Sequence, residues 1–318
     1  MKPILFLVCM AYGTFAMAQK VNYRILTDDP ENVKAFSLSL EPFYCDLYFT
    51  DIHLGYSVRA DLLLLKRMEV RADFRRAYLD ITGDETNTSE YHPKNGTKLA
   101  LYGEAGVSLF LRDKLKKSQA KLVLSSSSDG SYTYTKYIMI PATKRKMWGV
   151  RGGIYNNRVA YEMNGTDSCF VMKDNNGTET PAVDNTVTMM NATSLYGGLH
   201  WKSIVDVVAS TDYGTRKVGS MIDFYIDFLF APVVAFSDVN SPGDTEFSLK
   251  AKSDYVKRMG WRAGWAYRHP NKVALCYKFE FGARPGFRSM EKMTFMSQRS
   301  FLMFTVGVNI PAIKKNKD

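Results

Sequence analysis

Histidines are the side chains of this chain best suited to acid–base chemistry, and one of them stands near carboxylates. His53 and His200 fall on polar rows of predicted strands, and the other two histidines fall in connecting segments. A hydrolase that cleaves lipid or peptide needs a histidine within hydrogen-bond reach of a serine or an aspartate. His200 with Asp206 and Asp223 could form such a group. A histidine inside a network of charged side chains is the simpler interpretation.

Motifs that would support catalysis or metal binding are missing. The chain contains no G-x-S-x-G and no H-E-x-x-H sequence, and no paired spacing of metal ligands. The run Asp174–Glu179 is rich in oxygen atoms but lacks the ligand spacing of an EF-hand. We therefore expect a protein without catalytic activity, without a cofactor and without a bound metal.

Cysteines offer one candidate cross-link. Cys45 and Cys169 both fall in segments that we predict to be loops on the same side of the molecule. An exported protein can form a disulfide there, so a bond between these two residues is possible. Cys276 falls on the polar row of a predicted strand, where it would act as a small packing residue.

A second set of candidate residues consists of charged side chains on the polar rows of predicted strands. Both signs are mixed within single hairpins, whereas a wide selective pore tends to gather one sign at a constriction. Mixed neighbours favour ion pairs across a narrow interior, and buried ion pairs must be well satisfied to be tolerated. The predicted lumen network comprises Arg59, Asp61, Glu69, Arg71, Asp73, Arg75, Glu104, Arg151, His200, Lys202, Asp206, Asp223, Asp227, Arg262, Lys278, Glu280 and Arg284.

The strands that position these charges alternate between apolar and polar residues, with Lys117–Ser125 and Ser131–Ile140 less regular than the others. From Asp51 to Leu64, every second residue from Ile52 onward is apolar, and Met68–Asp80 repeats the pattern after a short turn. A period of 2 indicates a strand with one apolar and one polar face. Twelve such strands are predicted: Ala35–Phe43, Asp51–Leu64, Met68–Asp80, Lys98–Leu111, Lys117–Ser125, Ser131–Ile140, Lys146–Asn157, Leu195–Ala209, Ser220–Val234, Lys257–Tyr267, Val273–Arg284 and Ser300–Ile310.

The connections between these strands alternate between short turns and mostly longer polar loops. An even strand number with this alternation is the layout of a transmembrane, antiparallel, up-and-down β-barrel. We expect an all-β fold of about 12 strands, with 10 to 14 possible, and long outer loops. Closure satisfies every strand edge, and the apolar rows then face lipid. A secreted β-sandwich, in which the apolar rows pack on one another, is the alternative.

The N-terminus has the features of an export signal. Met1–Lys2 precedes a short apolar run, and Ala16-Met17-Ala18 ends it, as in a secretory signal peptide. We predict a signal peptide over residues 1–18, a periplasmic segment over 19–34, the barrel over 35–311 and a tail over 312–318. The net charge of +10 is spread over the chain, so nucleic acid is not an expected partner.

In style, the chain resembles outer-membrane barrels of the Bacteroidota. The resemblance rests on the signal peptide, the aromatic-rich alternating strands and the closing strand from Phe301 to Ile310. In such barrels the last strand is read by the insertion machinery, and here Pro311–Asp318 extends past it. The resemblance implies a location in the cell outer membrane of a Gram-negative bacterium, in contact with its lipid.

The expected function is that of an accessory or scaffold subunit of an envelope complex for assembly, secretion or transport. The mixed charges and the absence of a catalytic motif support it, and other envelope proteins are its possible partners. Two alternatives remain open: a narrow, porin-like pore or small-solute transporter, and a barrel lipid hydrolase or protease.

Overall fold

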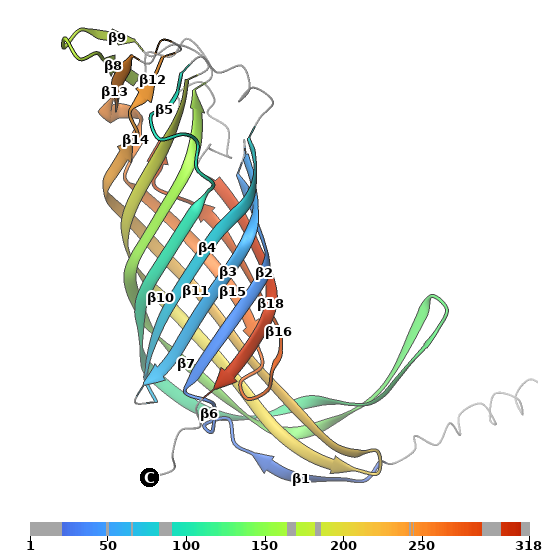
Figure 1. The fold of residues 1–318 in the computed structure, drawn as a ribbon. Coiled ribbons are helices and arrows are strands. Elements are labelled where there is room, and N and C mark those ends of the chain that lie inside the picture. The colour runs from blue at the N-terminus through green and yellow to red at the C-terminus, as the bar shows by residue number, and fades with distance from the viewer. Residues whose placement is uncertain are drawn as a thin grey trace, which may run out of the picture.

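A closed antiparallel β-barrel forms the body of the protein in the computed structural model (Figure 1). The structure describes residues 21–48, 51–64, 66–82, 91–163, 170–181, 186–241, 243, 245–287 and 300–312. The predicted signal peptide and residues 313–318 of the predicted tail lie outside these ranges. The described part of the chain has no helix long and apolar enough to cross a membrane.

Ten strands form the closed barrel, and each is paired with the barrel strand that precedes it and the one that follows it in the sequence. The pairing of β7 with β10 joins the two halves of the series, and β2 pairs with β18. This is the up-and-down arrangement that the alternating sequence predicts, so the predicted fold class is confirmed. The barrel strands are β2 (Phe36–Tyr48), β3 (Asp51–Leu64), β4 (Met68–Thr82), β6 (Leu101–Asp129), β7 (Tyr132–Met163), β10 (Thr186–Thr211), β11 (Gly214–Phe236), β15 (Met259–Arg268), β16 (Ala274–Ala283) and β18 (Ser300–Ala312).

The predicted count of about twelve strands is corrected to ten, the lower end of the predicted range. Segments predicted as four strands form only β6 and β7, which remain paired from Leu101 and Arg158 down to Asp129 and Tyr132. Bulges near Phe110 and Val123 shift the apolar alternation and give the false impression of separate strands. Pro141 is tolerated because β7 is there one edge of a two-stranded ribbon.

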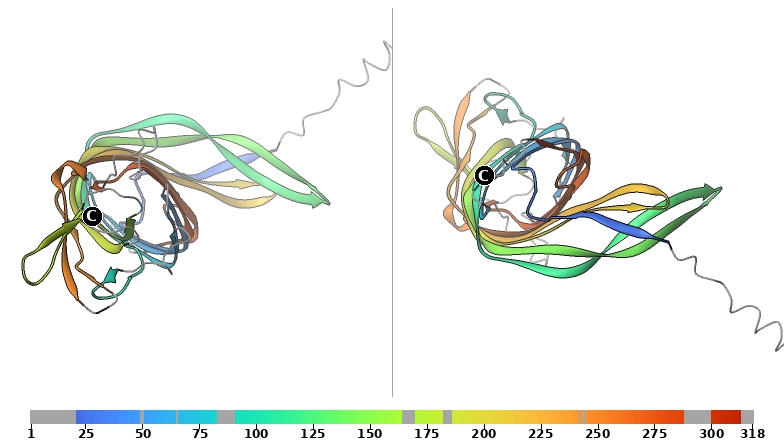
Figure 2. Two further views of the ribbon diagram at one scale, coloured as in Figure 1. Left: turned by 90° about the horizontal axis from the view of Figure 1, so that it is seen from above. Right: turned by 90° about the horizontal axis from the view of Figure 1, so that it is seen from below.

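Two hairpins extend beyond the barrel at the end where the described chain starts and finishes, here called the termini end (Figures 1 and 2). We call residues 111–147 the β6–β7 arm and residues 203–220 the β10–β11 arm. Leu122 and Leu124 belong to an apolar cluster that also contains Val205 and Val207, and this cluster holds the two arms together. Lys136 Nζ also donates to Tyr213 Oη, at 2.8 Å.

The N-terminal segment is more ordered than a tail. Within the predicted segment 19–34, β1 (Tyr23–Asp28) pairs with residues 207–211 of β10. The Asp28 carboxylate accepts hydrogen bonds from the backbone N–H and the hydroxyl of Thr143, at 2.7 to 2.9 Å. This contact lies where β7 and β10 diverge, so β1 fills the gap between the two arms.

Short elements lie at the opposite end of the barrel, here called the loop end (Figure 1). Asn-Gly turns at Gly96 and Gly177 have positive φ values of 70° and 86°, as a turn glycine permits. These elements are β5 (His92–Pro93), β8 (Phe170–Lys173), β9 (Glu179–Pro181), β12 (Val239–Asn240), β13 (Glu246–Ala251), η1 (Ser253–Tyr255), β14 (Val256–Lys257) and β17 (Gly286–Phe287).

The outer wall of the barrel is apolar on all ten strands. Exposed apolar side chains alternate with buried polar ones, for example Phe224, Phe228 and Phe230 along β11. Trp148, Trp201 and Trp261 are among the exposed aromatic residues. Such a surface is stable against hydrocarbon but not against water. Together with closure, it defines a transmembrane barrel.

Candidate functional site

The interior of the barrel is the candidate site, and it is lined by buried charge. The structure places all seventeen residues of the predicted lumen network at positions that are at least nine-tenths buried. Their strands alternate so that these side chains point inward while the apolar row points outward. Further buried polar residues join them: Glu41, Asp46, His53, Arg145, Arg268 and His269.

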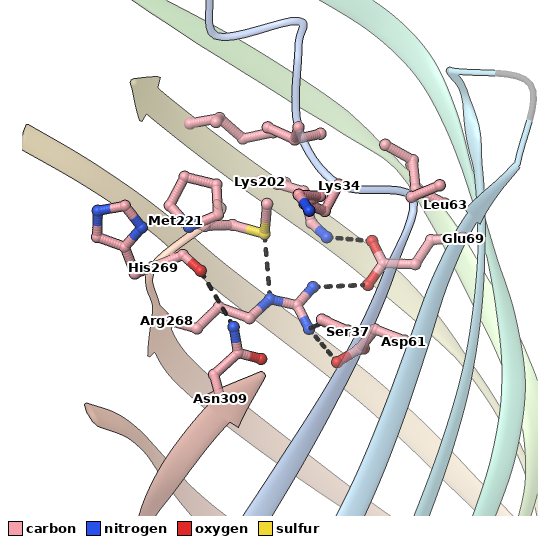
Figure 3. Close-up of a pocket in the computed structure, with 14 residues that line it drawn as sticks. Lys34, Ser37, Asp61, Leu63, Glu69, Lys202, Met221, Arg268, His269 and Asn309 are labelled. Carbon is pink, nitrogen blue, oxygen red and sulfur yellow. Dashed lines mark hydrogen bonds and ion pairs between the residues drawn. The ribbon is translucent and has the colours of Figure 1, made fainter. Parts of the chain in front are cut away.

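A cluster of ion pairs fills the lumen near the termini end (Figure 3). Arg268 of β15 reaches Asp61 of β3 across three intervening strands, and Lys202 of β10 reaches Glu69 of β4. Arg71 donates to Asp61 at 2.6 Å and to Glu69 at 3.0 Å. Each carboxylate therefore accepts from cations on two different walls, which ties those walls together.

A second cluster crosses the middle of the lumen. Arg75 of β4 donates to Asp73 at 2.8 Å and to Glu280 of β16 at 3.0 Å. Lys278 of β16 donates back to Asp73 at 2.8 Å. Tyr225 donates to Glu280 from β11. These bonds join three strands that are not neighbours in the sheet.

A third cluster centres on Glu104 of β6. Its carboxylate accepts from Arg151 at 2.5 Å and from Arg262 at 2.7 and 2.8 Å. Arg262 also donates to Asp227 at 2.8 Å. The Arg151 guanidinium lies 4.1 Å from the centre of the Tyr225 ring, within the range of a cation–π contact. β6 and β15 lie on opposite sides of the barrel, so Arg262 spans the interior.

Clusters of buried apolar side chains lie toward both ends of this charged interior. At the termini end, Val33 packs with Phe110, Met147, Ile204 and Met221. A cavity beside Arg268 and Lys202 has a volume of only about 20 Å³, which is room for about one water molecule. At the loop end, a larger cluster includes Tyr102, Phe170 and Phe287. Most of the buried charges thus lie between two apolar clusters.

Charge is balanced within the buried set. Among the described residues, ten acidic and ten basic side chains are buried. Arg284 near the loop end follows the same rule, because it donates to Asp46 at 2.7 Å and stacks 3.7 Å from the centre of the Phe301 ring. A balanced, mutually bonded set presents no excess of one sign to select a passing ion.

His200 lies within this network and brings together a serine and an aspartate. His200 Nδ1 is 3.0 Å from Ser108 Oγ, and Nε2 is 2.9 Å from Asp223 Oδ1. The predicted pairing with Asp223 is therefore present, whereas Asp206 lies elsewhere. Asp223 Oδ1 also lies 3.1 Å from Lys202 Nζ, so Asp223 belongs both to this group and to the charge network.

The backbone around Ser108 is part of the barrel sheet. Ser108 stands opposite Glu69 on one neighbouring strand and Arg151 on the other, so the backbone N–H groups around it belong to the sheet. Hydrolysis needs free donors aimed at the developing oxyanion. The described residues also contain no cluster of three or more metal-ligating side chains.

Asp206 lies at the boundary between the barrel and the β10–β11 arm. Its carboxylate accepts from Asn271 Nδ2 at 2.7 Å and lies 3.4 Å from Lys217 Nζ. Nearby, His269 sits in the turn between β15 and β16, and burial lowers its pKa below the usual value, while Asp206 opposes that shift. Asn271 donates its backbone N–H to His269 Nδ1 at 3.2 Å.

The predicted positions of two residues need correction. Cys45 is on β2 with a free thiol and not in an outer loop, because β2 continues to Tyr48. Its suggested disulfide partner, Cys169, lies outside the described residues. Arg268 falls just past the end of the predicted strand Lys257–Tyr267, but in the structure it is the last residue of β15 and bonds across the lumen. Its position two residues after Ala266, in the polar row of that strand, could have predicted that its side chain faces the lumen.

The closed sheet, its apolar exterior and its ion-paired interior define this protein as a transmembrane β-barrel. No protein-family model matches the chain, and no curated protein matches it. The chain is similar to solved structures of OmpT, an outer membrane protein of Vibrio cholerae. For the in-vitro folded form, the identity is 8%, the TM-score is 0.18, and the match covers 90% of this chain and 99% of that one.

A second structure, of OmpT expressed in the outer membrane, gives 8% identity and a TM-score of 0.19, with the same coverage. A mutant lacking loop L8 gives 9% identity and a TM-score of 0.17, covering 86% of this chain and 99% of that one. TM-scores this low do not indicate a shared function.

Proposed function

We propose that the protein is an integral outer-membrane β-barrel without catalytic activity, which serves as an accessory or scaffold subunit of an envelope complex. The observation that carries this proposal is the filled lumen. A pore needs a continuous wet path, whereas here ion pairs join opposite walls and apolar clusters lie toward both ends. The barrel then acts as a stiff membrane anchor.

The arms support the scaffold role, because they are not needed to span a membrane. Beyond Leu109, β6 pairs only with β7, so its other edge from Leu111 to Asp129 has no strand partner among the described residues. An unpaired edge offers backbone donors and acceptors to a strand of another protein. At the tip, Tyr132 and Tyr134 are 71% and 62% exposed. We propose that partners in the periplasm dock on this arm.

Co-purification from mild detergent tests the proposal. The wild-type protein should elute with a defined partner at fixed stoichiometry, and Tyr132→Ser/Tyr134→Ser should lose it. Tyr132→Phe/Tyr134→Phe is the matched control and should keep the partner, because the ring supplies most of the contact area. A wild-type protein that elutes alone from several mild detergents would contradict the scaffold role.

A second candidate function is that of a hydrolase with Ser108 as the nucleophile, because His200 lies between Ser108 and Asp223. If that candidate holds, Ser108→Ala should abolish hydrolysis of lipid or peptide substrates while the barrel still folds. Our proposal expects the same lipid profile in cells that express wild type or Ser108→Ala. A loss of lysophospholipid in the variant would favour the hydrolase.

A further inference from the structure

The root of the β6–β7 arm carries lysines directly opposite lysines. Lys114 pairs in register with Lys146, and Lys116 pairs with Lys144. Residues opposite each other, and residues two apart, share one face of a ribbon. The four lysines therefore extend from one face, and their Cβ atoms are spaced by roughly 5 Å across the strands and about 7 Å along them. Arg112, which is opposite Trp148, extends this basic face.

Nothing in the described structure neutralises the basic face. The ion pairs among the described residues involve none of these four lysines. On the opposite face of the same ribbon, Arg145 is bonded to Asp113 at 2.6 Å. The face with Arg145 thus contains an ion pair, while the other face holds five cations and no acid. Like charges placed directly opposite one another destabilise a ribbon, so the basic face is costly unless an anion binds there.

The basic face continues the lipid-facing surface of the barrel. Trp148 and Val150 share this face with Lys146, and both are exposed on the outer wall. Along β7, the surface changes from apolar to basic within one pair of residues. The arm leaves the barrel at the termini end (Figures 1 and 2). A tryptophan followed by lysines is the order expected where hydrocarbon meets lipid headgroups.

We propose that this basic face, Arg112, Lys114, Lys116, Lys144 and Lys146, binds the phosphate groups of anionic phospholipids in the leaflet at the termini end. This inference goes beyond the proposed scaffold function. Continuity with the lipid-facing wall favours lipid over an acidic protein as the occupant. The site fixes the arm against the leaflet and so sets the direction in which its tip projects.

Native mass spectrometry of the full-length protein tests this site. The protein is released from micelles that contain phosphatidylglycerol or phosphatidylcholine, and bound lipids are counted. Each lysine near an anionic surface contributes about fivefold in affinity, about 1 kcal/mol. Wild type should prefer phosphatidylglycerol, and Lys114→Gln/Lys146→Gln should lose most of this preference. Lys250→Gln/Lys252→Gln, with two exposed lysines at the loop end, should keep it.

A thermal measurement separates lipid binding from a structural role. In neutral detergent, Lys114→Gln/Lys146→Gln should unfold at the same temperature as wild type or higher, because a like-charge pair has been removed. Added phosphatidylglycerol should raise the midpoint of wild type and of the control, but not that of the arm variant. Equal binding of the two lipids by wild type, or equal losses in the arm and control variants, would overturn the proposal. So would binding of an acidic protein in place of lipid.

Discussion

In the lumen, several residues that face each other on neighbouring strands carry opposite charges, as in Asp61 and Arg71 or Lys202 and Asp223. Where two carboxylates face each other, as Asp73 and Glu104 do, buried arginines bond to both. In the root of the β6–β7 arm, cross-strand neighbours carry the same charge, as in Lys114 and Lys146. Residues 111–146 contain nine basic and two acidic residues, a net charge of +7, whereas the buried set is balanced at ten and ten.

This difference in charge pairing indicates what each region contacts. Buried ions must find partners within the protein, because no water replaces a missing one. An exposed basic ribbon can leave its partners to the surroundings. The charges of the lumen therefore neutralise one another, whereas the charges of the arm can be neutralised only by another molecule. The following variants test this contrast, from the largest expected effect to the smallest.

Breaking the lumen balance should have the largest effect. Glu104→Ala removes one of the two carboxylates that Arg151 and Arg262 share, the other being Asp227, and loss of one partner of a buried pair costs about 3–5 kcal/mol of unfolding free energy. Urea unfolding in lipid vesicles measures it. Glu246→Ala, which removes the partner of the exposed Lys94, is the control and should leave the midpoint unchanged. A loss below about 1 kcal/mol for Glu104→Ala would mean that water solvates the lumen.

Weakening the contact between the arms should act locally. Leu122 is 1% exposed and packs in the cluster that joins the arms, so Leu122→Ala should lower the opening free energy of the arms by about 2–5 kcal/mol. Hydrogen exchange should accelerate in residues 118–124 and 205–209, with the barrel midpoint unchanged, because the arms form a separate cooperative unit. A parallel fall of the barrel midpoint would show that arms and barrel unfold together.

Reversing one charge in the arm should stabilise the protein, in contrast to the two preceding variants. Lys116→Glu converts the like pair with Lys144 into an opposite pair, which should stabilise the arm by about 0.2–1 kcal/mol in neutral detergent. Slower amide exchange across β6 and β7 of the arm is the expected readout. Faster exchange there would show that the lysines contribute to the arm's own stability.

The smallest effect concerns the boundary between the two regions. Burial lowers the pKa of His269, with Lys217 and Lys272 acting in the same direction and Asp206 against it. The unfolded chain therefore takes up the proton first as the pH falls, so stability should decrease below a pH of about 6.5. His269→Gln should flatten the pH dependence of the unfolding free energy. An identical slope in wild type and variant would exclude this contribution.

Much of the barrel could be predicted because one physical rule governs it. The period of 2 located each barrel strand, and the polar row of each strand indicated which side chains share a face. The arms could not be predicted, because the bulges near Phe110 and Val123 shift that period and resemble turns. The strand β1 was also missed, because its partner is the distant end of β10 and its own sequence has no apolar alternation.

The partners within the lumen could not be predicted from the sequence. Whether Arg262 meets Glu104 or another carboxylate depends on the strand number and on the stagger around the barrel, which the strand pattern does not contain. Glu41 and Asp46 were also missed. Bulges in β2 disturb the alternation around them, and Asp46 lies in a segment that the sequence analysis assigned to a loop.

Planar bilayer recording of the wild-type protein tests the central claim, that the lumen is filled, most directly. Protein that migrates as a folded, heat-modifiable barrel is inserted from detergent, and the current is recorded at several voltages. The filled lumen predicts a trace at the baseline of a protein-free bilayer, because the ion pairs across the interior leave no wet path. Reproducible steps of ohmic conductance from the same preparation would contradict it.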